Sequence, residues 1–471
     1  MSSRGSALAL AAVGGLSLAS ALPAGAITPA RVGAEFQVNA YTWSAQFFPD
    51  VAMAADGDFI VVWEGFDTPG GDTTGSILGR RFAKNGAAQG ADFQINSYTT
   101  NTQRRPSVAA DADGDFVVVW ESVGSVGTDT PIPGGFSIQG QRYASDGTAR
   151  GAQFQVNAYT TGSQHVPSVS AAPDGDFVVV WTSFGSPATS FGPYSIQGQR
   201  FASDGSTQGA QFQVNTYSAH DSRFPSVSVA AGGDFVVVWD TYGSPGTDTG
   251  ISGSVQARRY ASDGSALGLQ FQVNTYTTDD QEVPHVATAG DGSFVVVWGS
   301  EGSSGTDANG WSVQGQRYAS GGSVAGAEFQ VNTDTTDNQF ASGVAASADG
   351  SFVVTWTSYG SSGTDSSYAS TQGQRYVSDG SARGAEFQVN TYTTYRQYRS
   401  SVAADTESGF VVVWTGYGSL RTDSSSYSVQ GQRYSLVALA ARVPATSSAT
   451  RFALAAALLL LGAAYALRRR A

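Results

Sequence analysis

Acidic residues with the spacing of a calcium-binding loop recur along the chain, each time before a short apolar run. In one copy Asp111, Asp113 and Asp115 precede the string FVVVW at residues 116–120. Alternating carboxylates suit Ca²⁺, but other copies keep fewer acids and no Glu completes the loop. Asp-Gly between two strands is also the strongest short hairpin signal. The pattern favours a structural turn; calcium is the alternative, and no other cofactor is predicted.

The three histidines are the remaining candidates for metal ligands. His165, His220 and His285 lie in or beside loops of three consecutive repeats, with Asp221 and Glu282 close by. Separate loops can supply ligands to one metal ion. None of the three belongs to a ligating motif, however, so we predict no metal site.

Composition and missing motifs narrow the function. The chain has no Cys, so it has neither disulfides nor a thiol nucleophile. Its net charge of −13 argues against a nucleic-acid partner, which would require a basic face. No G-x-S-x-G, H-E-x-x-H or phosphate loop is present. Nothing here identifies an enzyme, and a non-enzymatic role is favoured.

Seven internal repeats must position any site. The string FQVN, or FQIN, occurs at 36–39, 93–96, 154–157, 212–215, 271–274, 329–332 and 387–390. A Trp follows each copy, at Trp63, Trp120, Trp181, Trp239, Trp298, Trp356 and Trp414. Units of about 58 residues thus fill 33–434 as one repeat domain.

Each repeat contains four candidate strands, which in the second copy are 106–111, 115–122, 137–144 and 152–157. In FVVVW both faces of the strand are apolar, so both faces must be covered. Neighbouring copies of the same sheet provide this cover in a propeller. The sequence therefore predicts an all-β, seven-bladed β-propeller with four antiparallel strands in each blade.

The two ends of the repeat array predict how the ring closes. The array begins with a fourth strand at 34–39 and ends after a third strand at 428–435. We expect the N-terminal strand 34–39 to complete the last blade. A linear solenoid would instead show polar capping repeats.

Loop lengths predict where a ligand binds. The loops after the second and fourth strands are long and share one rim, and binding residues often lie on such loops. The residues just before each inner strand differ between repeats and should surround the mouth of the channel. The predicted ligand-binding residues are Phe47, Arg104, His165, Arg223, Glu282, Phe340 and Tyr398. For an enzyme, carboxylates such as Glu282 and Asp307 would have to meet across this rim.

Both ends of the chain resemble targeting segments. Residues 1–26 have a charged start, an apolar run and a small-x-small site, as in a secretory signal peptide. After a linker at 435–450, residues 451–471 read as a transmembrane segment with Arg468, Arg469 and Arg470 on the cytoplasmic side. With Val443 and Pro444, this tail resembles the PEP-CTERM sorting signals handled by exosortases, and is similar to the sortase signal Leu-Pro-x-Thr-Gly. A retained membrane anchor is the alternative.

The repeats resemble those of large secreted and surface-attached bacterial proteins, which are often adhesin-like. The acidic turn is also loosely similar to the Asp-box of sialidase-type propellers, a fold element. The leading interpretation is an exported, envelope-anchored, non-enzymatic binding propeller whose ligand is an extracellular polysaccharide or matrix component. Its partners would be the membrane, a sorting protease or transpeptidase, and the polysaccharide. The alternatives are a carbohydrate-active hydrolase or lyase using the same rim, and a structural surface-layer component.

Overall fold

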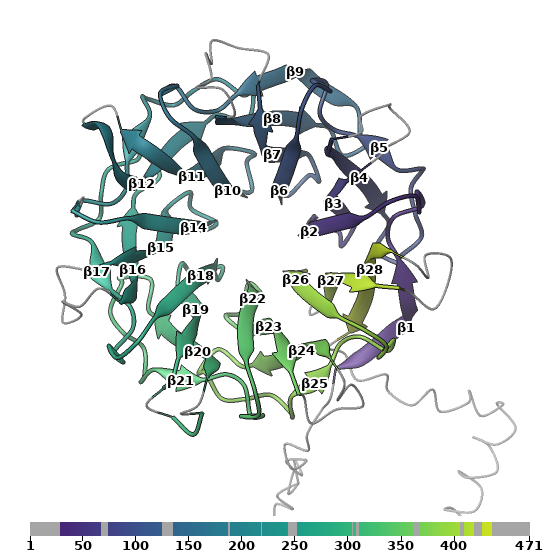
Figure 1. Cartoon of the computed structure of the whole chain (residues 1–471), viewed down its shortest axis with the longest axis vertical. Coiled ribbons are helices and arrows are strands. Elements are labelled where there is room, and N and C mark those ends of the chain that lie inside the picture. The colour runs from purple at the N-terminus through teal and green to yellow at the C-terminus, as the bar shows by residue number, and fades with distance from the viewer. Residues whose placement is uncertain are drawn as a thin grey trace, which may run out of the picture.

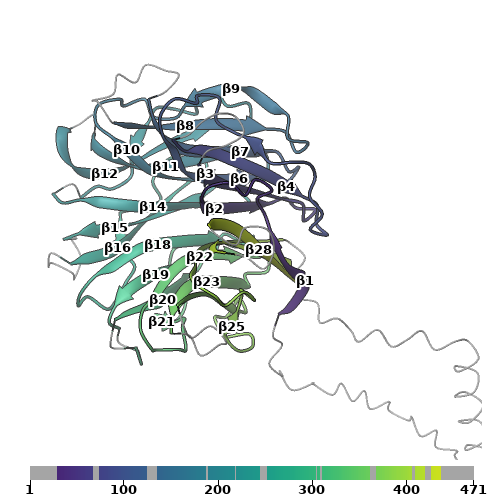
Figure 2. The same cartoon turned by 45° about the vertical axis from the view of Figure 1, so that its right-hand side comes forward.

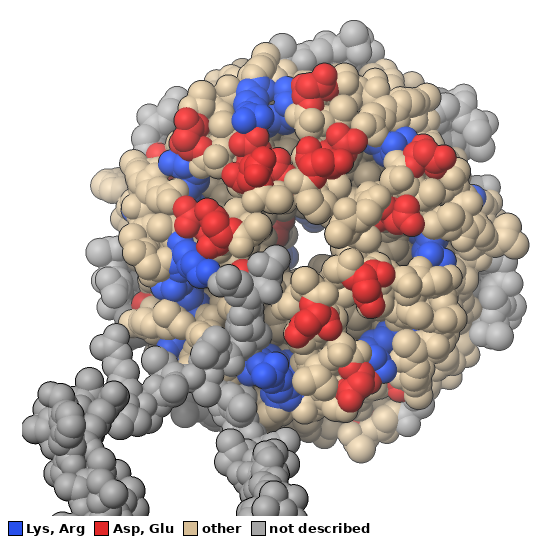
Figure 3. All heavy atoms as spheres, turned by 180° about the vertical axis from the view of Figure 1, so that it is seen from behind, with Lys and Arg blue, Asp and Glu red and all other residues tan. Residues whose placement is uncertain are grey.

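The computed structural model describes residues 29–66, 74–124, 135–186, 189–217, 219–243, 252–303, 305–307, 310–360, 368–405, 409–418 and 426–435. These residues form seven four-stranded antiparallel sheets, arranged as the blades of a ring (Figure 1) with an open channel at its centre (Figure 3). The predicted seven-bladed β-propeller is therefore confirmed. The described residues contain no helix long and apolar enough to span a membrane. The predicted signal peptide (1–26), Val443, Pro444 and Arg468–Arg470 lie outside the described residues.

In each blade the strands run from the channel outward. The innermost strands are β2 (Gln46–Met53), β6 (Gln103–Ala110), β10 (Gln164–Ala171), β14 (Ser222–Val229), β18 (Gln281–Thr288), β22 (Gln339–Ala346) and β26 (Gln397–Ala404). The second strands are β3 (Phe59–Gly65), β7 (Phe116–Val123), β11 (Phe177–Ser186), β15 (Phe235–Tyr242), β19 (Phe294–Glu301), β23 (Phe352–Tyr359) and β27 (Gly409–Tyr417). The third strands are β4 (Ser76–Phe82), β8 (Phe136–Tyr143), β12 (Thr189–Phe201), β16 (Gly253–Tyr260), β20 (Trp311–Tyr318), β24 (Ala369–Tyr376) and β28 (Tyr427–Ser435). The outermost strands are β5 (Phe93–Gln94), β9 (Ala149–Gln155), β13 (Phe212–Gln213), β17 (Phe271–Gln272), β21 (Phe329–Gln330), β25 (Phe387–Gln388) and β1 (Ala30–Gln37).

The second strand of each blade is covered by sheets on both sides, as its sequence requires. Phe116, Val118 and Trp120 of β7 pack in one core cluster with Ile60 and Val62 of β3. The opposite face of β7 packs in the same way against the third blade. Alternation of side chains along a strand thus turns one apolar string into two interblade contacts.

The inner strand differs from its predicted bounds. In the second blade β6 begins at Gln103, three residues before the predicted start at 106. The register shifts between Arg104 and Ser107, and Arg105 has a φ of 51°. A bulge therefore lets the strand continue beyond Pro106, which lacks an N–H to donate.

The acidic strings form turns between the first two strands of a blade. The Oδ1 of Asp111 accepts hydrogen bonds from the N–H groups of Asp113 (3.0 Å) and Asp115 (2.9 Å). Gly114 has a φ of 82°, which favours glycine at that position. The predicted structural turn is present, and its carboxylate satisfies backbone donors.

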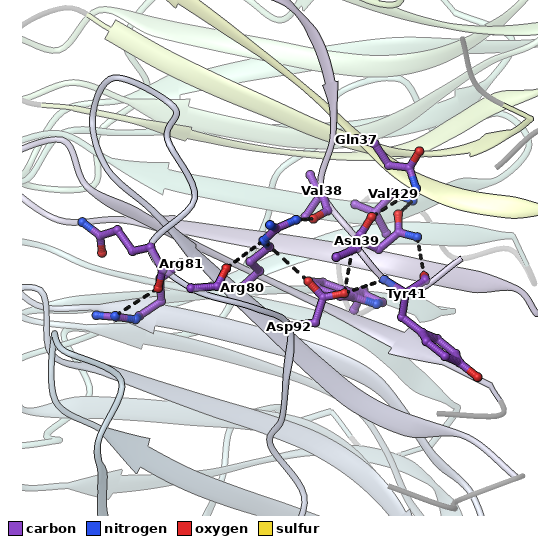
Figure 4. A network of polar contacts seen from close by, with 12 residues as sticks. Gln37, Val38, Asn39, Tyr41, Arg80, Arg81, Asp92 and Val429 are labelled. Atoms are coloured by element: carbon purple, nitrogen blue, oxygen red, sulfur yellow. Dashed lines mark hydrogen bonds and ion pairs between the residues drawn. The ribbon is translucent and has the colours of Figure 1, made fainter. Parts of the chain in front are cut away.

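The FQVN string joins each blade to its neighbours. Where the ring closes, Asn39 Oδ1 accepts from the N–H of Val429 at 2.9 Å, and its Nδ2 donates to the carbonyl of Tyr41 at 2.8 Å (Figure 4). From the next blade, Asp92 Oδ2 accepts from the N–H of Tyr41 at 2.9 Å, and Arg80 donates to the carbonyl of Val38 at 2.8 Å. The Asn bonds recur in every blade.

The N-terminal strand closes the ring, as predicted. Strand β1 pairs antiparallel with β28 as the outermost strand of the seventh blade. It begins at Ala30, earlier than the predicted 34, because residues 30–32 pair with 433–435 on the far side of a register shift. The carboxylate of Glu35 also accepts from the N–H of Thr391 at 2.6 Å. Both ends of the described chain therefore lie at the same blade (Figure 2).

The buried indoles give a first prediction. In five blades the indole N–H donates to a Gln on the inner strand, as Trp181 does to Gln164 at 2.8 Å. In the fourth blade Ser222 occupies the Gln position, and the indole nitrogen of Trp239 has no acceptor among the described residues. We expect Ser222→Gln to raise the free energy of unfolding by about 0.5–1.5 kcal/mol. Gln164→Ser should lower it by about 1–3 kcal/mol, since a buried donor loses its acceptor.

Urea unfolding followed by Trp fluorescence measures both effects. Opposite shifts of the two midpoints would support the role of this hydrogen bond. Shifts in the same direction would contradict it.

Candidate functional site

The seven predicted binding residues surround the channel at one end of the inner strands. Each occupies the second position of its strand, opposite the residue that follows the Trp of the same blade. The pairs are Phe47 with Glu64, Arg104 with Glu121, His165 with Thr182, Arg223 with Asp240, Glu282 with Gly299, Phe340 with Thr357, and Tyr398 with Thr415. We call this end of the channel, with these fourteen positions, the channel mouth. The ligand-binding role of the seven residues stays a prediction.

A bulge after each predicted residue connects neighbouring blades at the channel mouth. In six blades the next residue is left-handed, with φ between 49° and 54°: Phe48, Arg105, Val166, Phe224, Val283 and Arg399. The N–H of Val166 donates to Glu121 Oε1 of the preceding blade at 2.7 Å. The N–H of Val283 donates to Asp240 Oδ2 in the same way at 3.3 Å. In these two blades the carboxylate after the Trp therefore accepts the N–H of the left-handed residue in the next blade.

Glu121 is the centre of a charged cluster at this mouth. Its side chain is fully buried, and its Oε2 lies 2.7 Å from Arg104 Nε. Arg105 Nη1 lies 3.5 Å from Oε1, and His165 Nδ1 lies 3.5 Å from Oε2. Burial alone would raise the pKa of Glu121. The contact with His165, the charges of Arg105 and Arg104 and the N–H of Val166 outweigh it and hold the pKa below its usual value, so Glu121 is ionised.

Glu64, in the preceding blade, has the opposite tendency. It is 5% exposed and accepts a hydrogen bond from the backbone N–H of Arg105 at 3.3 Å. Burial raises the pKa of Glu64 to about 7, with a further increase from the charge of Glu121; the N–H of Arg105 and the two arginine charges oppose this only in part. Two carboxylates of adjacent blades thus differ in protonation near neutral pH. Such a split is typical of groups that exchange protons with a substrate.

The fourth and fifth blades carry a second group of charges. Asp240 is 3% exposed, and burial raises its pKa well above the usual value. Tyr242 donates its hydroxyl hydrogen to Glu282 Oε1 at 3.0 Å. Arg223 lies over the ring of Tyr194, with 4.6 Å between guanidinium carbon and ring centroid. Acids predominate on this side, while arginines surround Glu121.

Aromatic side chains line the rest of the channel mouth. The ring of Phe47 in the first blade lies 4.7 Å from the ring of Tyr427, measured between centroids. The ring of Tyr398 in the seventh blade lies 6.0 Å from the same tyrosine. Arg399 lies over the ring of Phe48 at 4.0 Å. Phe340 is 37% exposed, between Trp311 at 5.8 Å and Tyr359 at 6.1 Å.

The structure separates the three histidines. His165 is at the channel mouth, His220 lies in the loop before β14, and His285 lies inside β18. Burial lowers the pKa of His285 to about 4, so it is neutral. Among the described residues, no group of three or more His, Cys, Asp or Glu side chains could hold a metal ion. Asp307, the carboxylate considered for an enzyme, is buried and accepts a hydrogen bond from Asn332 at 3.0 Å.

The sequence interpretation missed Glu64, Glu121 and Asp240. Their signal was nevertheless present, because the position directly after the Trp is Glu, Thr, Asp or Gly in different repeats, whereas the preceding VVVW changes only to IVVW in the first repeat and to VVTW in the sixth. A carboxylate that ends a buried strand next to variable rim residues is a candidate for chemistry.

The opposite face of the ring is built differently. It carries the short turns, and acidic side chains gather around the channel opening there (Figure 3). Between the first two blades these turns border a crevice of about 310 Å³ lined by Asp56, Asp113 and Arg81. The guanidinium group of Arg81 donates a hydrogen bond to the carbonyl of Ser145 in the next blade, so it contributes to the contact between the two blades.

The opposite pKa shifts of the two glutamates give a second prediction. Because the pKa of Glu64 rises to about 7 on folding, folding favours its protonated form, and stability falls as the pH rises from about 4.5 to 7. Glu64→Gln stays neutral and should be more stable than the wild type at pH 8, by on the order of 1–3 kcal/mol. Glu121→Gln should be less stable there, since Arg104 and Arg105 lose an ionised partner.

Thermal unfolding between pH 4 and pH 8 measures both variants. Equal pH profiles for Glu64→Gln and the wild type would contradict the raised pKa of Glu64.

Comparisons with known proteins concern the fold. No family model matches the chain, and no curated protein is significantly similar to it in sequence. The crystal structure of the polysaccharide lyase Uly1 superposes with a TM-score of 0.51 at 9% identity, over 86% of this chain and 100% of that one. A protein of unknown function from Dyadobacter fermentans gives 0.47 at 10% identity, over 87% and 98%. The NanB sialidase from Streptococcus pneumoniae gives 0.45 at 12% identity, over 86% and 71%. At these identities the similarity shows the propeller fold alone.

Proposed function

We propose that this propeller is a carbohydrate-active protein that cleaves an extracellular polysaccharide at the channel mouth, as a hydrolase or a lyase. The observation that carries the proposal is Glu64, a buried carboxyl whose pKa is raised to about 7 beside the ionised Glu121. The similar structure of a polysaccharide lyase supports the proposal in one respect: it shows that a propeller of this kind can act on polysaccharides. This departs from the leading sequence interpretation, which was non-enzymatic binding.

Hydrolysis and elimination share one chemical need that Glu64 can meet. In both, the glycosidic oxygen that leaves must receive a proton. A carboxyl with a pKa near 7 is still partly protonated at neutral pH and can donate that proton. Glu121 is fully buried and ionised, whereas Glu64 keeps 5% of its surface exposed. The role of Glu121 is to position Arg104 and Arg105 through the contacts of 2.7 and 3.5 Å.

Non-enzymatic binding at the same channel mouth is the second candidate. It is favoured by Phe340, which is partly exposed between Trp311 and Tyr359 and offers an aromatic surface to a sugar ring. A purely structural role has less support, since it explains the backbone hydrogen bonds of Glu64 and Glu121 but not the partly exposed ring of Phe340.

Turnover of a polysaccharide panel tests the proposal. The full chain is incubated with neutral and uronate-containing polysaccharides, and new reducing ends and unsaturated sugars are measured. We expect Glu64→Gln to lower kcat by about 10²–10⁴-fold, the usual contribution of a general acid, while binding is retained. The control is Glu328→Gln. Glu328 accepts from Thr275 at the blade periphery, and Gln153 holds the corresponding position in the second blade.

The outcomes separate the candidates. Turnover that Glu64→Gln leaves unchanged would overturn the role of Glu64. Binding without turnover by the wild type would favour the non-enzymatic candidate.

We also propose that the chain is exported and attached to the cell envelope through residues 451–471. The geometry of the last blade supports a useful orientation. Ser435, at the end of β28, pairs with Gly409 on the short-turn face, while Tyr427 pairs with Tyr417 at the opposite end, toward the channel mouth. The described chain therefore ends, at Ser435, on the face of the ring opposite the channel mouth.

Cell fractionation tests this attachment. The full chain should appear in the envelope fraction, and a variant truncated after residue 442 should appear in the medium. Recovery of the full chain from the cytoplasm would contradict export.

A further inference from the structure

A row of tyrosines extends from the channel mouth to the rim. Tyr427, which contacts Phe47 and Tyr398 at the mouth, lies 4.9 Å from the ring of Tyr417. Tyr417 lies 5.1 Å from Tyr395, and Tyr395 lies 6.2 Å from Tyr368. We call Tyr427, Tyr417, Tyr395 and Tyr368 the tyrosine row. It crosses from the seventh blade to the sixth, because Tyr368 directly precedes β24.

The outer half of the tyrosine row is open to solvent. Tyr368 is 50% exposed and Tyr395 is 46% exposed. Their rings lie at 31° to each other, closer to coplanar than the edge-on pairs farther in, which meet at 76°. Two neighbouring rings that are half exposed are not accounted for by core packing.

The backbone of Tyr395 is strained. Its φ is 64°, a left-handed conformation that is an outlier for a bulky side chain. In five of the six other blades the corresponding position is also left-handed and holds a small or polar residue, namely Ser44, Asn101, Gly162, Asp279 or Asp337. In the fourth blade this position is His220. The fold therefore needs only a small residue at this position, yet the seventh blade has a large aromatic one. Such backbone strain concentrates at functional sites.

We propose that the tyrosine row is a second binding site for the polysaccharide, so that the ligand is an extended chain lying from the channel mouth outward over the seventh and sixth blades. This inference rests on the proposed function. Tyr offers a flat apolar face and a hydroxyl at its edge, which suits a sugar ring with an apolar face and polar rim. The row is continuous with Phe47 and Tyr398, so a polymer held at the mouth would reach Tyr395 and Tyr368 only when several sugar units long.

The repeats provide variants that are compatible with the fold. Tyr395→Asn restores the residue type of Asn101, and Tyr368→Ser restores that of Ser252 and Ser426, which stand at the same place before the third strands of other blades. Tyr395→Asn also relieves the left-handed strain, so the thermal stability of the double variant should not fall. The control is Leu269→Ala, which removes an exposed apolar side chain (86% exposed) before β17.

The test measures the binding of oligosaccharides of different length by titration calorimetry. The probes are cello-, xylo-, chito- and galacturonate oligosaccharides, each as a disaccharide and as a hexasaccharide. For the series that binds, we expect the hexasaccharide to bind the wild type about tenfold or more tightly than the disaccharide. The double variant should lose that gain while keeping its affinity for the disaccharide, and Leu269→Ala should behave as the wild type.

Each other outcome overturns the inference in a distinguishable way. If the double variant binds the hexasaccharide as tightly as the wild type does, the tyrosine row does not contribute to binding. The proposal for the channel mouth would be unaffected by that result. A wild type that binds the hexasaccharide no more tightly than the disaccharide shows that the ligand does not extend over the tyrosine row. If no oligosaccharide binds and Glu64→Gln has no effect on any activity, the proposed function fails as well.

Discussion

The burial of one indole per blade between two sheets is the constraint on which the propeller depends. All seven indoles are fully buried, and in five blades the ring N–H needs a Gln of the innermost strand as its acceptor. This hydrogen bond links the inner strand to the second strand. The faces of the indole ring are removed from water only by packing against the neighbouring sheet. A blade on its own would leave both of its apolar faces in water, so the sheets are stable only as a closed ring. The pairing of β1 with β28 meets that requirement at the seventh blade.

The channel mouth follows from the same packing. The residue after each Trp is the first of its strand to reach the mouth, and it faces the bulge of the next blade. That bulge offers a backbone N–H, so a side chain with an oxygen is suited to this place, as with Glu64, Glu121, Asp240 and the hydroxyl of Thr357. A carboxylate at this position satisfies backbone and remains near the channel. The residue after the Trp can therefore stabilise the fold and also provide a reactive group. This residue can change from blade to blade while the fold stays the same.

The sequence predicted the repeat architecture well because its signals are local and repeated seven times. Strand periodicity, Asp-Gly turns and the offset between the first and last repeats each follow from a few consecutive residues. The mouth was predicted only as a set of positions. Glu64 and Arg105, or Phe47 and Tyr427, meet only because blades are neighbours in the ring, and in the second pair only because the ring closes. Desolvation of Glu64 likewise depends on the surrounding blades, so no pattern in the sequence predicts a pKa near 7.

The strain at Tyr395 shows how a rigid repeat can hold an unfavourable residue. On one side, Asn390 of FQVN donates to the carbonyl of Tyr392 at 2.9 Å, as its counterparts do in other blades. On the other side, the N–H of Tyr417 donates to the carbonyl of Arg396 at 2.9 Å. The loop is therefore held at both ends by bonds that do not depend on the residue between them. A left-handed conformation that costs on the order of 1–3 kcal/mol is tolerated there, because the flanking hydrogen bonds over-determine the backbone. Repetition thus leaves single loop positions free to change, and in the seventh blade that freedom places an exposed aromatic ring next to those that lead to the channel.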